Sequence, residues 1–128
     1  MIDLSAYWRA VLNQDAEAMR GFLCEDASVR WHNTNEEFTR EEFIRANCEY
    51  PGRWSGKMER AEVAEDVIVC AVHVHGPGGA PSFHCASFLR LNGDRIAAID
   101  EYWGDDGEVP EWRRKMRIGR PICRKNEN

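Results

Sequence analysis

Residues 82–103 of the chain read SFHCASFLRLNGDRIAAIDEYW, and this stretch decides the fold. Residues 82–91 and 95–103 have the period of two that is typical of β-strands. Asn92 and Gly93 stand between them, and an Asn-Gly pair is a strong signal for a two-residue hairpin turn. The stretch therefore predicts two long antiparallel strands joined by a tight turn.

Two further strands are predicted ahead of this hairpin. In residues 57–63 and 67–75 the spacing of apolar side chains changes from the helical period found upstream to a period of two. Residues 76–81 read GPGGAP, a composition typical of a turn. The second half of the chain is therefore predicted to be a meander of four antiparallel strands.

The N-terminal part of the chain has helical periodicity. Residues 4–12 place their apolar side chains on one face of a helix, and residues 19–23 indicate a second, short helix. Residues 27–33 alternate in polarity and predict a short strand. The first segments are therefore expected in the order helix, helix, strand.

A third helix has the clearest start signal in the sequence. Thr39 and Glu42 have the spacing of a capping box, and Phe38 and Phe43 stand where a hydrophobic staple needs apolar side chains. The helix must end before Pro51, because the residue ahead of a proline is disfavoured in the helical conformation.

Helices that precede an antiparallel sheet make an α+β fold. We expect a cone-shaped barrel, in which a strongly bent, mixed but mainly antiparallel sheet wraps around three N-terminal helices. A chain of 128 residues has the size of one domain, so residues 1–128 are assigned to a single domain with residues 110–128 as a C-terminal extension. A sheet bent around the first helix leaves a cavity at its wide end, where small molecules bind.

Composition narrows the possible partners. A net charge of −5 argues against nucleic acid, and no apolar run approaches the roughly 20 residues that span a bilayer. Residues 1–4 show no secretory signal, so we expect a cytoplasmic protein that contacts no membrane. An odd number of cysteines without a C-x-x-C pair argues against a disulfide framework. The five are Cys24, Cys48, Cys70, Cys85 and Cys123.

The C-terminal extension is basic, unlike the rest of the chain. Seven of the 17 lysines and arginines lie between Arg113 and Lys125. We expect this segment to pair with the acidic body or with a second subunit. The alternative is an anion-binding or nucleic-acid arm, but no aromatic residues are interleaved as such an arm would need.

Two stretches resemble the nuclear-transport-factor-2-like superfamily, in its SnoaL-like and ketosteroid-isomerase-like branches. They are residues 7–33, YWRAVLNQDAEAMRGFLCEDASVRWHN, and residues 94–103, DRIAAIDEYW. With the layout between them, the likeness covers nearly the whole chain and implies the cone-shaped fold. It does not imply one reaction, because this fold is used by enzymes, binding proteins and transport factors alike.

The resemblance also assigns the isomerase's catalytic positions to residues of this chain. The phenol donor corresponds to Tyr7, the general base to Trp31 and the acid donor to a position near Ser87. An indole cannot abstract a proton, and a serine is not the acid, so the resemblance does not predict ketosteroid isomerase activity. The pocket tryptophan corresponds to Trp103, which implies that Ile99 shares its inward face.

Glu101 is the first candidate for a catalytic residue. It shares the inward face implied for Trp103, which would surround its carboxyl with tryptophans and a phenol. Burial raises the pKa of a carboxyl toward values useful in acid–base chemistry. The alternative is that Glu101 pairs with an arginine such as Arg45 and only shapes the pocket.

His73 is the second catalytic candidate. It lies two residues from His75, so both share one face of a strand, and the resemblance suggests that this face is the inner one. A histidine near Glu101 would complete an acid–base pair, but it is equally expected as a wall residue bonded to backbone. An H-x-H pair with a carboxylate also fits a metal site, although without a strict spacing we expect neither a metal nor another cofactor.

The pocket is predicted to have aromatic walls that suit a small apolar or aromatic molecule, and a cation can also stack on such walls. Cys85 is a possible nucleophile in it, although a buried and inert thiol is the simpler interpretation. The expected ligand-binding residues are Tyr7, Trp31, Asn33, Trp54, His75, Cys85, Ser87, Ile99 and Trp103.

The residues therefore predict a small-molecule pocket protein and leave its class open. It is either a cofactor-independent lyase, isomerase or cyclase that uses acid–base chemistry, or a non-catalytic ligand-binding or dimeric interaction domain. Alternation places Cys70, Val72, Val74 and Phe88 on the outer sheet face. An apolar face of that kind predicts a homodimer that buries it.

Overall fold

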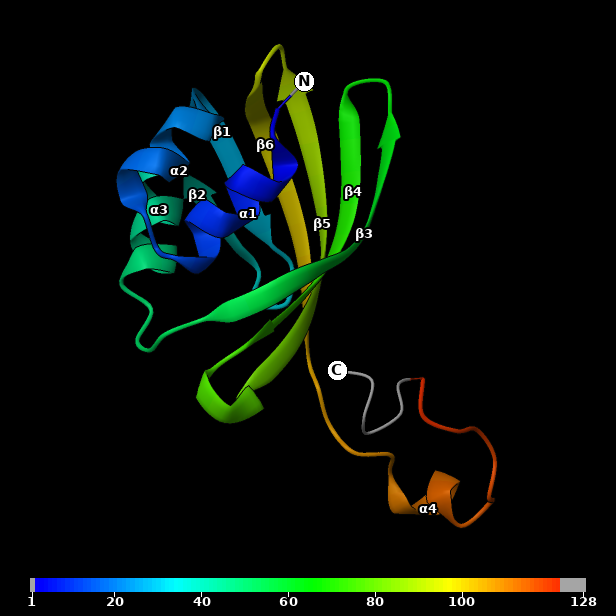
Figure 1. Ribbon diagram of the computed structural model, residues 1–128. Coiled ribbons are helices and arrows are strands. Elements are labelled where there is room, and N and C mark those ends of the chain that lie inside the picture. The colour runs from blue at the N-terminus through cyan, green and yellow to red at the C-terminus, as the bar shows by residue number, and fades with distance from the viewer. Residues whose placement is uncertain (1, 123–128) are drawn as a thin grey trace.

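The computed structural model describes residues 2–122 and contains four α-helices, one 3₁₀ turn and six strands (Figure 1). In chain order they are α1 (Leu4–Leu12), α2 (Ala16–Phe22), β1 (Leu23–Trp31), β2 (Glu36–Thr39), α3 (Arg40–Cys48), β3 (Ser55–Ala64), β4 (Val67–His75), η1 (Pro77–Gly79), β5 (Ser82–Asn92), β6 (Arg95–Asp105) and α4 (Glu111–Arg114).

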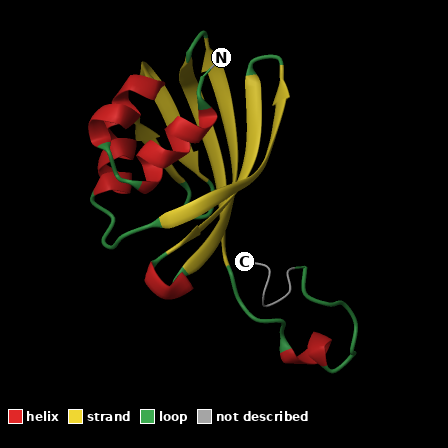
Figure 2. Ribbon diagram, in the orientation of Figure 1, coloured by secondary structure: helices red, strands yellow, loops and turns green. Residues whose placement is uncertain are grey.

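The six strands form one mixed sheet in the order β2-β1-β6-β5-β4-β3. Only the β1–β6 pair is parallel, and every other neighbouring pair is antiparallel. The expected α+β class and mainly antiparallel sheet are confirmed. The sheet does not close into a barrel, however, because its edges β2 and β3 do not pair. Helices α1, α2 and α3 lie together on one side of the bent sheet (Figure 2), where α1 contacts β3 and α3 contacts β1.

Capping side chains start α1 and α3 where the sequence predicts, whereas α2 begins at Ala16 instead of residue 19. Thr39 Oγ1 accepts a hydrogen bond from the Glu42 backbone N–H at 3.2 Å, and Glu42 Oε1 accepts one from the Thr39 N–H at 2.9 Å. The expected capping box is confirmed, and it satisfies two donors that have no partner inside the helix. Asp3 caps α1 by accepting from the Ala6 N–H at 3.0 Å.

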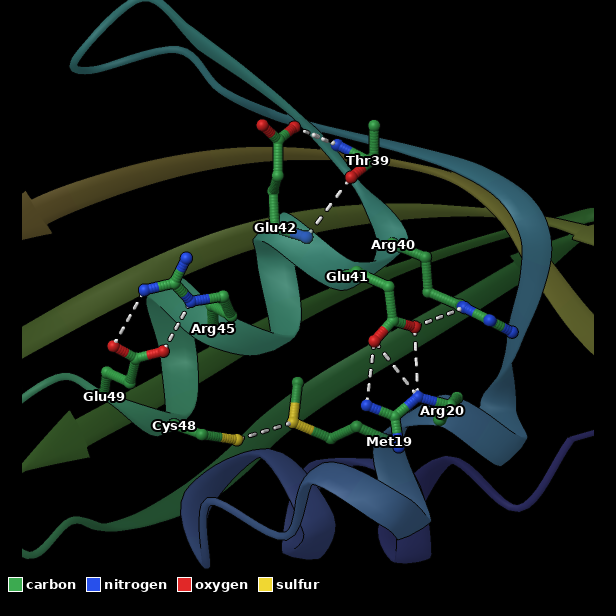
Figure 3. A network of polar contacts seen from close by, with 9 residues as sticks. All are labelled: Met19, Arg20, Thr39, Arg40, Glu41, Glu42, Arg45, Cys48 and Glu49. Carbon is green, nitrogen blue, oxygen red and sulfur yellow. Dashed lines mark hydrogen bonds and ion pairs between the residues drawn. The ribbon is translucent and has the colours of Figure 1, made fainter.

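Polar contacts connect the helices outside the core, as Figure 3 shows. Arg20 of α2 donates from Nη2 and Nε to the Glu41 carboxylate of α3 at 2.8 and 3.0 Å. Arg45 donates to Glu49 one turn later, at 2.6 Å. These pairs are exposed and contribute little to stability one by one, but the first orients α2 against α3.

A two-residue turn joins β5 and β6, as predicted, but its residues are Gly93 and Asp94 rather than Asn92 and Gly93. Asn92 lies opposite Arg95, which leaves a two-residue loop, and Gly93 has a positive φ of 65° as such turns require. A register shift between Arg90 and Leu91 then places Ser87 opposite Glu101 and Cys85 opposite Trp103. The inner face of β6 therefore contains Glu101 and Trp103, as expected.

Strand β4 faces the opposite way from our expectation. Its buried side chains are Ile68, Cys70, Val72 and Val74, which lie on the inner face with the core. His73 and His75 therefore lie on the outer face, and the prediction that His73 faces the pocket is wrong. Placing Cys70, Val72 and Val74 on the outer face was wrong for the same reason. Of that predicted outer group only Phe88, which is 41% exposed, lies outside.

Two elements of the fold were not expected. Strand β2 pairs with the second half of β1 at the edge of the sheet, although its sequence EEFT shows no alternation and only Phe38 is half-buried. Helix α4 lies in the C-terminal extension, which leads away from the sheet in Figure 1. Its ion pairs are local, from Arg114 to Glu108 at 3.6 Å and from Lys115 to Glu111 at 3.7 Å.

The four described cysteines are free thiols, and Cys70 and Cys85 are buried. Cys123 and the basic residues beyond it lie outside the described residues. No helix within residues 2–122 is long and apolar enough to cross a membrane.

Candidate functional site

A cavity of about 520 Å³ lies on the inner side of the sheet, between its strands and the helices. Its walls come from α1, α3 and the segment after α3, and from the ends of β1, β4, β5 and β6. The lining residues are Trp8, Val11, Leu12, Trp31, Asn33, Thr34, Ala46, Asn47, Tyr50, Trp54, Val74, Phe83, Trp103, Gly104 and Asp105.

Aromatic rings dominate this wall. Trp54 contacts Tyr50 with ring centroids 5.2 Å apart and Phe83 with centroids 5.9 Å apart. Phe83 continues the wall to Trp103 at 6.3 Å in an edge-on arrangement. Such rings bury flat or apolar molecules well, and their faces also attract cations.

The amide groups in the wall already have structural partners. Trp103 donates its backbone N–H to Asn33 Oδ1 at 2.5 Å, and Asn33 Nδ2 donates back to the Trp103 carbonyl. Asn47 Nδ2 donates to the Val11 carbonyl at 2.9 Å. Asn33 thus attaches the end of β6 to the turn after β1. Because both polar atoms of its amide are bonded to the Trp103 backbone, Asn33 adds little polar surface to the cavity.

The Glu101 carboxyl lies next to this cavity and is held by three uncharged donors. Trp31 Nε1 and Trp103 Nε1 donate to Oε1 at 3.1 and 3.2 Å, and Ser87 Oγ donates to Oε2 at 2.9 Å. Glu101 is only 2% exposed. Because both tryptophans line the cavity and Glu101 does not, the carboxyl lies behind their indole edges.

Burial controls the protonation of Glu101. It raises the pKa of the carboxyl, and the hydrogen bonds from Ser87, Trp103 and Trp31 only partly oppose it. The alternative partner Arg45 is wrong, because that guanidinium pairs with Glu49 on the outer side of α3. Glu101 is therefore buried without a cationic partner among its hydrogen bonds.

Tyr7 is fully buried on α1 and lies behind the cavity wall rather than in it. Its ring packs edge-on against Trp8 at 5.4 Å and Phe22 at 5.7 Å, and its hydroxyl has no hydrogen-bond partner among residues 2–122. Burial, together with the nearby charge of Glu101, raises the pKa of Tyr7 well above its ordinary value. The phenol is thus neutral and close to the same carboxyl.

The other expected site residues divide into two groups. Cys85, Ser87 and Ile99 are buried on the inner face, but they lie beneath the cavity wall. Burial raises the pKa of Cys85 far above its ordinary value, which leaves it a protonated thiol without nucleophilic character. His75 lies on the outer face with His73, so neither histidine belongs to this site.

Several lining residues were missed by sequence reasoning. Trp8, Val11 and Leu12 belong to the apolar stripe of the first helix, and they were not among the expected ligand-binding residues. Asn47 and Tyr50 lie at the end of α3, where nothing but proximity to Trp54 in the chain indicated them. The apolar stripe of the first helix could have indicated Trp8, Val11 and Leu12. When a sheet wraps around a helix, the buried face of that helix also lines any cavity between the two.

The sequence matches no protein-family model and no curated protein. Solved structures are similar in fold. A candidate ketosteroid isomerase from Kribbella flavida DSM 17836 superposes with a TM-score of 0.78 at 20% identity, covering 98% of this chain and 90% of that one. An NTF-2 like protein of unknown function from Burkholderia xenovorans LB400 gives 0.76 at 18% identity, covering 94% and 92%.

A third similar structure is a hypothetical protein with a ketosteroid isomerase-like fold from Catenulispora acidiphila DSM 44928, solved in complex with trimethylamine. Its TM-score is 0.67 at 17% identity, covering 80% of this chain and 86% of that one. Identities of this size show the fold and not the activity. The resemblance noted in the sequence is confirmed at that level: the chain has the fold of NTF2-like and ketosteroid isomerase-like proteins.

Proposed function

We propose that the protein binds a small, mainly apolar or aromatic molecule in the cavity between its helices and the sheet. The observation that carries this proposal is the wall of six aromatic side chains around about 520 Å³, a size that suits a small organic molecule. They are Trp8, Trp31, Tyr50, Trp54, Phe83 and Trp103. An alkylamine is a reasonable probe as well, because aromatic faces bind cations and the Catenulispora protein holds trimethylamine.

A ligand panel tests the binding proposal. Small aromatic alcohols, cyclic ketones and trimethylamine would be added to the full chain, and the melting temperature measured. We expect one class to raise it in wild type and in Phe88→Ala, an outer-face control, but not in Trp103→Ala, which removes part of the wall. The proposal fails if no class shifts the melting temperature, or if Trp103→Ala responds like wild type.

Acid–base catalysis by Glu101 is the second candidate function, as in a cofactor-independent lyase, isomerase or cyclase. The observation in its favour is a buried carboxyl with a raised pKa that touches two cavity-lining indoles. A substrate would reach this carboxyl once Trp31 or Trp103 turns aside.

Turnover separates the two candidates. Ligands found by the panel would be incubated with wild type and with Glu101→Gln, and products followed by NMR. Catalysis predicts turnover by wild type that falls at least a hundredfold in the variant, since general acid–base groups contribute about 10²–10⁴-fold. Equal turnover would remove Glu101 from the chemistry, and binding without turnover would support the non-catalytic alternative.

A homodimer is a separate proposal. On the outer face Phe88 and Tyr102 are 41% and 48% exposed, and their rings lie 5.9 Å apart. The C-terminal extension also exposes Trp112 and Met116. A second copy that covers these groups would give twice the chain mass of 14.8 kDa by light scattering, and Phe88→Glu should lower it. A monomer mass for wild type would contradict the dimer.

A further inference from the structure

Two histidines form a close pair on the outer face of the sheet, away from the aromatic cavity. His73 on β4 lies directly opposite His84 on β5. Their rings stack with centroids 4.7 Å apart and planes 10° apart. Both side chains are partly exposed, at 35% and 49%, so an ion from solution can reach their nitrogens.

A β-bulge in the neighbouring strand adds a carboxylate to this pair. Met58 lies opposite Val72 and Arg60 opposite Ala71, so Glu59 is an extra residue without a partner on β4. Bulges of this kind redirect a side chain. Glu59 Oε2 lies 3.4 Å from His84 Nε2, two strands away.

The spacing of the three side chains is that of a metal site before its ligands close on the ion. One donor atom from each of Glu59, His73 and His84 lies within 4.8 Å of the other two. Zinc bonds of about 2.0–2.1 Å in tetrahedral geometry put ligand atoms roughly 3.4 Å apart. The Glu59–His84 pair already has that separation, and the donor atom of His73 lies within 4.8 Å of both.

A second carboxylate orients the histidines from behind. Asp106 Oδ1 accepts a close hydrogen bond from His84 Nδ1, and Asp106 Oδ2 lies 3.6 Å from His73 Nε2. Ser82 Oγ donates to the same Oδ2 at 2.5 Å. The carboxylate bonded to His84 Nδ1 keeps the proton there and leaves His84 Nε2 free as a metal ligand, as in known carboxylate–histidine–zinc arrangements. On His73 it is Nε2 that is held from behind, by Ser82 Oγ at 2.8 Å, which leaves Nδ1 as the nitrogen for the metal.

We propose that Glu59, His73 and His84 bind a divalent transition metal, Zn²⁺ in the first place, on the outer face of β3, β4 and β5. Two imidazole nitrogens and one carboxylate oxygen suit zinc and its neighbours in the transition series, whereas Ca²⁺ and Mg²⁺ prefer oxygen ligands alone. Three protein ligands leave a fourth position for water. The ion would tie the edge strand β3 to β5, so it would stabilise the fold by mass action.

Isothermal titration with ZnCl₂ on the EDTA-treated full chain tests this proposal. We expect one Zn²⁺ per chain in wild type, affinity reduced at least tenfold in His84→Gln and in Glu59→Gln, and a zinc-dependent rise in melting temperature. His32→Gln is the matched control: His32 is also on the outer face and bonds Asp100 at 2.7 Å, but it is not part of the three-ligand cluster.

Three results would overturn the site. They are no heat of binding at 100 μM ZnCl₂, equal losses in His84→Gln and His32→Gln, or binding that survives in the His73→Gln/His84→Gln double variant. If the double variant still binds zinc and alkylation of the thiols abolishes this binding, the cysteines are the ligands. Asp106→Asn adds a graded outcome, since removing a partner behind a ligand costs about 10–100-fold in metal affinity; unchanged affinity would contradict the role given to Asp106.

Discussion

The sheet has one carboxylate network on each side. Glu101 of β6 organises the inner network and Asp106, which follows β6 directly, organises the outer one. The two networks differ in the groups that donate to the carboxylate. Inside, Glu101 accepts from two indoles and one hydroxyl, none of which titrates near neutral pH. Outside, Asp106 accepts from His84 and from Ser82. The inner network therefore keeps one geometry over a wide pH range, whereas the outer one changes charge with pH.

The surroundings of the two carboxyls move their pKa values in opposite directions. Burial raises the pKa of Glu101 despite its hydrogen bonds. Burial also opposes the charged form of Asp106, but less so, and the hydrogen bonds from Ser82 and His84 hold its pKa below the ordinary value. Similar numbers of hydrogen bonds thus give opposite pKa shifts for two reasons. Glu101 is almost fully buried, and only Asp106 is also attracted by the charges of nearby histidines.

Glu101→Ala should break the inner network with the largest effect on stability. It leaves the donors of Trp31, Trp103 and Ser87 buried without an acceptor, and each costs about 1–3 kcal/mol when unpaired. We expect the free energy of unfolding to fall by about 3 kcal/mol or more in urea titrations. Ser87→Ala, which removes one donor and keeps the acceptor, should cost only about 1 kcal/mol; equal losses would show that Glu101 does not organise the network.

Glu101→Gln should sharpen the comparison through pH. In wild type the folded pKa lies above the unfolded one, so the folded state binds the extra proton and stability falls as pH rises from about 4.5 through the folded pKa. The glutamine variant lacks this loss. Its stability relative to wild type should therefore increase with pH over that window and then level off.

A matched exposed carboxylate should give the opposite sign. Glu49 hydrogen-bonds Arg45, which lowers the pKa of Glu49. Its stabilising effect is present above the unfolded pKa and is lost as pH falls through the folded one. Urea titrations between pH 3 and 9 on Glu101→Gln and Glu49→Gln provide the check, and parallel pH profiles for the two variants would refute the assignment of burial as the cause.

Two tryptophans of the cavity wall differ in whether their indole N–H has an acceptor. Trp31 Nε1 donates to Glu101, whereas Trp54 Nε1 is buried without a partner among the described residues. Trp31→Phe removes a used donor and Trp54→Phe an unused one, so we expect the former to cost about 1 kcal/mol more. Equal melting temperatures for the two variants would mean that the indole bond to Glu101 contributes nothing.

Strong local signals in the sequence placed the inner network correctly. The Asn92-Gly93 signal located the hairpin between β5 and β6, and the period of two along β6 put Glu101 on the same face as Trp103. The pairing of Ser87 with Glu101 also depends on a register shift between Arg90 and Leu91, which the turn does not determine. The capping box at Thr39 likewise located α3. In these places one short motif locates one element of structure, so a single sequence is enough to place it.

The sequence did not predict the outer network, because β4 is largely apolar on both faces and its inner face was assigned wrongly. VIVCAVHVH has apolar side chains at seven of its nine positions, so alternation alone cannot assign its inner face. Its only polar residues, His73 and His75, share one face and mark it as the outer one. That signal was overridden by the family resemblance. The bulge at Glu59 and the edge strand β2 depend on how each strand pairs with its neighbour, and neither stretch has a periodicity that reveals this pairing.

Asp106→Asn should have the smallest effect on stability and the clearest effect on titration. The hydrogen bond that His84 donates to Asp106, and then the charge of Asp106, raise the pKa of His84. This contribution to stability is fully present below the unfolded histidine pKa of about 6.5 and is lost as pH rises through the folded one. His84 is 49% exposed, so solvent limits the effect to a few tenths of a kcal/mol. By NMR the pKa of His84 should be lower in Asp106→Asn than in wild type. An unchanged His84 pKa in the variant would contradict the role of Asp106. It would show that Glu59, at the bulge in β3, controls the charge of His84 instead.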